Sequence, residues 1–223
     1  MTRNHTRNEI QNLLDLLLEF EIAIDINTVR ILNLPSGRFR VTWASGQYLL
    51  SPHESEFGTI QEYVDWASQR QFSALLFDGA MLQISYDFVG NDVIGHRLLY
   101  YPCPLDVAHD WLKTEPLDEV MDAYRGEESY YRLRSPVRFD YDPDSVGELH
   151  PASHVTLNFS HCRTPVIAPL SLGHFIKFVF RSFYPPLWAT LDFLREWPQP
   201  KQAITIRPAE ETGLHFSYRD SIF

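Results

Sequence analysis

The residues best suited to chemistry gather in one stretch of the chain. The stretch RFDYDPDSVGELHPASHVTLNFSHCR, which begins at Arg138, holds two arginines, three aspartates, one glutamate and three histidines in 26 residues. A histidine beside a carboxylate can act as a general base, and an arginine can hold a phosphate in its planar fork. This set suits metal-free cleavage or transfer of a phosphodiester. The candidate catalytic residues are Arg138, Asp140, His150 and His154, and the candidate phosphate ligand is Arg163.

Alternating side chains predict two strands in this stretch, 137–141 and 154–159. If the two strands pair as antiparallel neighbours, one face collects Arg138, Asp140 and His154. Val137, Phe139 and other apolar residues then face the core. The alternative is that the polar residues form only the solvated face of an antiparallel sheet, joined by a turn at Asp142-Pro143-Asp144. Both interpretations remain open from the sequence.

A metal site is a weaker interpretation of the same residues. His150 and His154 have the spacing of a helical zinc pair, but the residues that follow are typical of a strand and no third ligand is marked. The two cysteines, Cys103 and Cys162, cannot build a four-cysteine zinc site or a disulfide framework. There is no glycine-rich phosphate loop and no dinucleotide fingerprint. We therefore predict no metal and no cofactor.

A second polar row is expected on a helix that runs from Ser171 to Tyr184. His174, Lys177 and Arg181 are spaced three and four residues apart and so share one side of that helix. Their chemistry predicts contacts with phosphate or nucleic acid. The alternative is the solvated face of an amphipathic helix.

The elements that would position these residues indicate an α+β fold. A Thr-x-x-Glu capping box at Thr6 predicts an apolar N-terminal helix that reaches about Ile24, buried in the core or bound to a partner. A second capping box at Thr59 predicts a short helix. Strand-like alternation with Asp-Gly and Gly-Asn turns predicts a meander, followed by two helical pieces broken at Pro116. The predicted segments are 39–43, 59–67, 73–88, 93–101 and 106–125, a helix at 187–197 and a last hairpin of 203–207 with 214–218. The fold class is thus a mostly antiparallel sheet packed by helices, in one domain, residues 1–223.

Charge is distributed unevenly along the 223 residues. The net charge of −10 argues against general nucleic-acid binding. However, residues 106–148 contain twelve Asp or Glu and five Lys or Arg, whereas residues 149–207 contain two and six. A local basic patch is enough for phosphate contacts. Pairing between the two stretches is the alternative. The polar N-terminus carries no secretory signal and no run could cross a bilayer, which predicts a cytoplasmic protein with no membrane partner.

Several segments together resemble an uncharacterised bacterial family, catalogued as a domain of unknown function. They are LQISYDF, HRLLYYPCP, VRFDYD, HPASHVTLNF, CRTPV and PLSLGHFIKFVFRSFYP. The family is similar in setting to genes found among mobile elements and phage-defence clusters. The resemblance implies a role in bacterial defence beside partner proteins of the same gene cluster. It carries over no catalytic residues.

Three functional hypotheses follow from these observations. The leading one is a cytosolic component of a bacterial defence module that acts on, or docks beside, nucleic acid, with nuclease or other phosphodiester-acting activity left open. The second is a non-catalytic acidic adaptor or inhibitor that binds a partner protein through residues 106–148. The third is a metal hydrolase.

Overall fold

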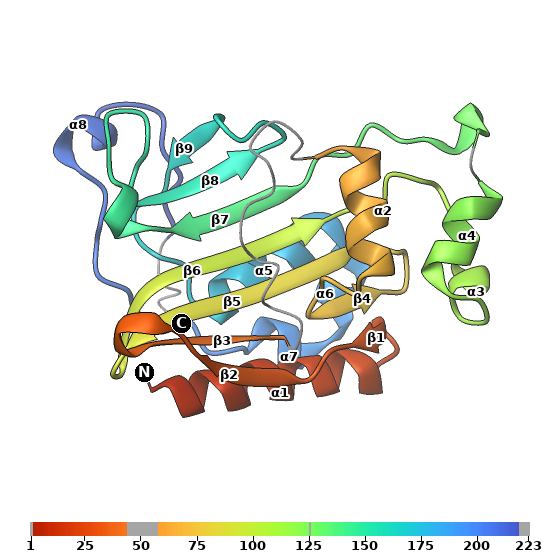
Figure 1. The fold of residues 1–223 in the computed structure, drawn as a ribbon, viewed down its shortest axis with the longest axis horizontal. Coiled ribbons are helices and arrows are strands. Elements are labelled where there is room, and N and C mark those ends of the chain that lie inside the picture. Colours follow the sequence, from red (N-terminus) through yellow and green to blue (C-terminus); the bar gives the residue numbers. More distant parts are fainter. Residues whose placement is uncertain (1, 44–57, 125, 219–223) are drawn as a thin grey trace. The chain divides into compact units, whose positions relative to one another are not determined.

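The computed structural model describes residues 2–43, 58–124 and 126–218, which fold into two compact units. Unit 1 comprises residues 1–138 and 156–162, and unit 2 comprises residues 139–155 and 163–223. The described residues contain nine strands together with helices, and the pairs within unit 1 are all antiparallel (Figure 1). The predicted α+β class is confirmed.

Unit 1 is built on an antiparallel sheet. In this sheet β4 and β5 pair, as do β5 and β6, and β5 also pairs with β3, while β1 joins β4 and β2 joins β3. The bounds are β1 Ala23–Ile26, β2 Val29–Asn33, β3 Arg38–Trp43, β4 Ala74–Leu76, β5 Met81–Val89 and β6 Asp92–Tyr101. The turn between β4 and β5 needs Gly79, whose φ of +81° suits a residue without a side chain. The predicted meander is confirmed.

The N-terminal helix α1, Arg3–Glu19, packs against β1, β2 and β3. It begins earlier than its capping box predicted, because the side chain of Thr2 accepts a hydrogen bond from the His5 amide at 3.2 Å. Thr6 lies inside the helix instead. One stripe, made of Ile10, Leu13, Leu14 and Leu17, is completely buried. The helix is therefore part of the core, one of the two predicted arrangements.

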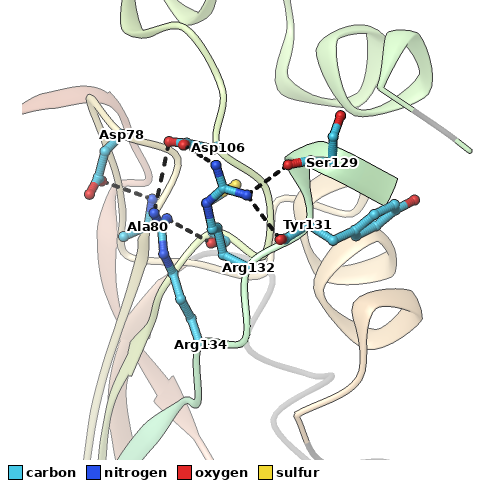
Figure 2. Close-up of polar contacts among 8 residues, drawn as sticks. Asp78, Ala80, Asp106, Ser129, Tyr131, Arg132 and Arg134 are labelled. Carbon is cyan, nitrogen blue, oxygen red and sulfur yellow. Dashed lines mark hydrogen bonds and ion pairs between the residues drawn. The ribbon is translucent and has the colours of Figure 1, made fainter. Parts of the chain in front are cut away.

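An arm that carries two short helices extends from the end of β6. Helix α2, Ile60–Ser68, precedes β4 in the chain. The arm follows β6 and forms two helices, α3, His109–Leu112, and α4, Leu117–Ala123. The two are separated at Pro116, as predicted. Its two ends form a ladder, in which the Asp106 amide donates to the Tyr130 carbonyl and the Arg132 amide to the Pro104 carbonyl. Figure 2 shows the Arg132 guanidinium donating to Asp106 at 2.6 Å and to the Ser129 carbonyl at 2.8 Å. These contacts tie the arm closed at its base.

Unit 2 contains short strands and the helices that follow them. The boundary between the units falls within β7, Val137–Tyr141, and β8, Ser153–Leu157, which are hydrogen-bonded neighbours as predicted. The strand predicted at 154–159 is too long, because β8 ends at Leu157 and Phe159 is 70% exposed. Asn158 breaks the strand by its positive φ of 61°. The remaining elements are β9 Arg163–Pro165, α5 Leu172–Phe183, α6 Pro185–Thr190, α7 Asp192–Arg195 and α8 Pro208–Glu211.

Two predictions for the C-terminal part are wrong. The single helix expected at 187–197 is two short helices, α6 and α7, because the backbone of Leu191 has an extended conformation that interrupts the helix. The expected last hairpin does not form. Instead, the Thr205 amide donates to the Ile167 carbonyl, and the Phe216 amide donates to the Pro165 carbonyl. Both segments thus bond to residues 165–167 rather than to each other.

Within the described ranges, no helix is long and apolar enough to cross a membrane.

Leu17 supplies a test of the buried stripe on α1. Replacing Leu17 by Asp places a charge in an apolar site with no partner, which should lower the free energy of unfolding by about 3 kcal/mol or more. The matched control is Leu18→Asp, one position along, where the side chain is 44% exposed and the change should cost little. Chemical denaturation of both variants is the measurement. Equal stability of the two would contradict the buried stripe.

Candidate functional site

The predicted strand pair does bring two of its polar residues together. The His154 Nε2 atom lies 3.6 Å from Asp140 Oδ2, and both side chains are almost wholly buried. Arg138 on β7 and Thr156 on β8 are buried as well. The alternative of a solvated sheet face is therefore wrong for these residues. They lie in the interior, where an unpaired charge is costly.

His154 is held from both sides of its ring. Its Nδ1 atom lies 2.9 Å from the Pro151 carbonyl oxygen, which can only accept, so Nδ1 carries the hydrogen. The other nitrogen faces Asp140. Only 2% of the His154 side chain is exposed, whereas a general base has to reach the proton that it removes. This geometry favours a structural role for the contact between His154 and Asp140. The predicted catalytic roles of Asp140 and His154 stay predictions.

His150 is the more accessible histidine of this cluster. Its ring stacks edge-on against that of His154, with the centroids 4.8 Å apart. Burial lowers the pKa of His150, and the neighbouring His154 and Arg163 lower it further. The ring is therefore neutral at physiological pH, the state in which a histidine accepts a proton. Arg163, on β9, is half-buried near this cluster. Any acid–base chemistry here would fall to His150 in the first place.

The second predicted set lies along α5. Ser171 caps this helix as predicted, since its Oγ atom accepts from the His174 amide at 3.3 Å. His174 is buried, Lys177 is half-buried and Arg181 is exposed, so the row runs from the interior to the surface. The alternative of a fully solvated helix face is wrong for His174. Its ring nitrogen Nδ1 lies 2.7 Å from Ser171 Oγ, which fixes the ring.

These three side chains line a cavity of about 500 Å³ inside unit 2. This volume is within the range of small-molecule sites, about 300–1,000 Å³. The other lining residues are aromatic, polar or aliphatic and come from β7, the segment before α5, α5 itself and two segments after it. They are Phe139, Val166, Leu170, Phe178, Ser182, Gln199, Phe216, Ser217 and Tyr218. The cavity thus combines cationic groups with aromatic rings.

One wall of the cavity depends on a glycine. A Cβ atom on Gly173 would overlap the Pro198 carbonyl oxygen and would stand 3.0 Å from Gln199 Cγ. The absence of a side chain therefore allows residues 198–199 to lie against α5. In this position Gln199 Oε1 is buried and accepts no hydrogen bond from the residues that the structure describes.

The two predicted sets do not form one site. Phe139 lines the cavity, whereas Asp140, the next residue on β7, contacts His154. Successive side chains of a strand point to opposite faces, so β7 separates the cavity from the buried contact between Asp140 and His154. Sequence reasoning missed Gly173, Phe178, Gln199 and Tyr218 as site residues. Only Gly173 carried a signal, as a glycine inside an otherwise apolar helix.

Among the described residues, no group of three or more His, Cys, Asp or Glu side chains could hold a metal ion.

Asp140 supplies a test of the buried pair. Asp140→Asn leaves the buried His154 without its carboxylate, which should lower the free energy of unfolding by about 3 kcal/mol. Glu148→Gln, which neutralises an exposed carboxylate in the same segment, should leave it almost unchanged. Thermal and denaturant unfolding of both variants is the measurement. An Asp140→Asn protein as stable as the wild type would show that the carboxylate does not brace the strands.

Comparisons with known proteins identify the family of this chain. No curated protein and no solved structure matches the chain. A family model described as "Uncharacterized conserved protein (DUF2290)" matches residues 24–218, which include most of unit 1 and every lining residue of the cavity. The chain therefore belongs to the DUF2290 family of uncharacterized conserved proteins.

Proposed function

We propose that the protein binds nucleic acid through unit 2, with Lys177 and Arg181 contacting phosphates at the cavity. One observation carries the proposal, namely two cationic side chains on consecutive turns of α5 that line a cavity with aromatic walls. Arginine and lysine are the usual phosphate contacts, and aromatic rings are the usual platforms for bases. The protein as a whole is acidic, so the contact has to be local.

The setting that we propose is a cytoplasmic defence module in a bacterium. The resemblance noted in the sequence supports this setting, and the partners would be proteins of the same gene cluster. Cleavage is a separate question. If the protein cuts phosphodiesters, the neutral and accessible His150 is the better candidate for the base. Arg138, Asp140 and His154 would then position His150 and not contact the substrate themselves.

A second candidate function is a non-catalytic adaptor. On α4, Asp118, Glu119 and Asp122 form an exposed acidic side, opposite the buried Leu117 and Val120. Such a surface suits a basic partner protein. Not all of the acidic charge of residues 106–148 is available, since Asp106 pairs with Arg132 (Figure 2). Charge reversal on α4 should disrupt the complex in this case and leave nucleic-acid binding intact.

Charge reversal on α5 tests the leading proposal. Lys177→Glu and Arg181→Glu should each weaken the binding of a single-stranded oligonucleotide by roughly tenfold or more, because each variant loses a phosphate contact and adds repulsion. The slope of log affinity against log salt should fall by about 0.7 for each lost contact. Fluorescence anisotropy at several salt concentrations measures both quantities.

The matched control is Lys201→Glu, which makes the same charge change at an exposed position outside the cavity lining. It should leave affinity and slope close to those of the wild type. If Lys201→Glu weakens binding as much as the two α5 variants do, binding follows net charge and the assignment to α5 fails.

A further inference from the structure

We propose that the cavity of unit 2 takes up one unpaired base together with its phosphate, so that the ligand class is a nucleotide, free or within a single strand. This inference rests on the proposed function and deepens it. Phosphate contacts alone need only surface cations, whereas this cavity has a volume of about 500 Å³ and aromatic walls that such contacts do not use.

The aromatic side chains of the cavity are fixed in place before any ligand arrives. Phe178 packs edge-to-face on Phe139, with centroids 5.0 Å apart and planes at 81°. Tyr218 lies against the His174 ring at 4.2 Å, and its hydroxyl donates to the Pro169 carbonyl at 2.7 Å. Rings held in this way lose little freedom when a flat ligand stacks on them. They favour a planar group over a flexible chain.

Gln199 indicates that the planar ligand also carries a hydrogen-bond donor. Its buried Oε1 atom accepts no hydrogen bond within the described part of the chain, and a buried acceptor without a donor is costly. Gln199 lines the cavity, so a rotation of its amide would bring Oε1 to an N–H group at the edge of a ligand. Every nucleic-acid base carries such a donor, whereas a phenyl ring or a lipid chain carries none.

The cations fix the third property of the ligand, which is negative charge. Lys177 and Arg181 belong to the same cavity as Phe178 and Gln199. Since an anion, a planar ring and an N–H donor are required together, a nucleotide is the class of ligand that fits. A base inside a duplex is stacked and paired on both sides, so the cavity should select single strands or free nucleotides.

Binding of small probes to the full chain tests the inference. Calorimetric titrations would compare adenosine monophosphate with ribose 5-phosphate, which keeps the phosphate and lacks the base. Adenosine monophosphate should bind at least about tenfold more tightly, because the stacking contacts and the hydrogen bond to Gln199 require the base. A single-stranded oligoadenylate should likewise bind more tightly than the same sequence in a duplex.

Gln199→Leu supplies the matching variant. It keeps the side-chain volume and removes the acceptor, so affinity for adenosine monophosphate should fall about tenfold with no loss of thermal stability. The control is Gln202→Leu, the same change at an amide outside the cavity lining, which should leave affinity unchanged. Phe178→Leu is a second variant, which removes an aromatic face and should also weaken the nucleotide.

The outcomes separate this inference from the proposed function. Equal binding of adenosine monophosphate and ribose 5-phosphate, or a Gln199→Leu protein that binds the nucleotide as the wild type does, overturns the base site. Phosphate-driven binding of strands would survive that result. Nucleotide binding that depends on Gln199, in a protein that binds no strand, supports the base site and overturns the nucleic-acid function.

Discussion

The close approach of residues 198–199 to Gly173 is the constraint on which the cavity depends. Any side chain on Gly173 would collide with the Pro198 carbonyl group, and the segment would have to move away from α5. Gln199 would then lose its place in the cavity wall. Glycine costs helix stability, by roughly 1 kcal/mol relative to alanine. A glycine at the second position of α5 is thus found where close packing requires it. This packing places Gln199 in the wall of the same cavity as Lys177 and Arg181.

Strand β7 connects the two groups of polar residues that the sequence singles out. One face of β7 presents Phe139 to the cavity, and the other presents Asp140 to His154. A buried contact between polar side chains adds little net stability compared with apolar packing, but leaving one partner alone in the interior is costly. Loss of either partner is therefore expected to weaken the pairing of β7 with β8. In this account the histidine and aspartate position the wall of the cavity, and the side chains on α5 meet the ligand.

Local patterns predicted local structure well. The spacing of His174, Lys177 and Arg181 was enough to place them on one side of α5, and strand alternation was enough to place Asp140 beside His154. Burial of that pair could not be predicted, because it depends on neighbours distant in the sequence. Nor could the cavity, whose wall joins α5 to Gln199 and Tyr218. Two signals misled. Thr2 and Thr6 are both good caps, and residues 203–207 have a strand-like pattern but bond to Ile167.

The central claim is that a nucleotide lies in the cavity of unit 2. Photochemical cross-linking tests it most directly, with a single-stranded oligonucleotide that carries one photoreactive base and with mass spectrometry to locate the attached peptide. The account predicts attachment within 174–182, at Gln199 or within 216–218, and its loss when excess adenosine monophosphate is added. Attachment confined to the acidic arm of unit 1, or attachment in unit 2 that the nucleotide does not compete away, would contradict it.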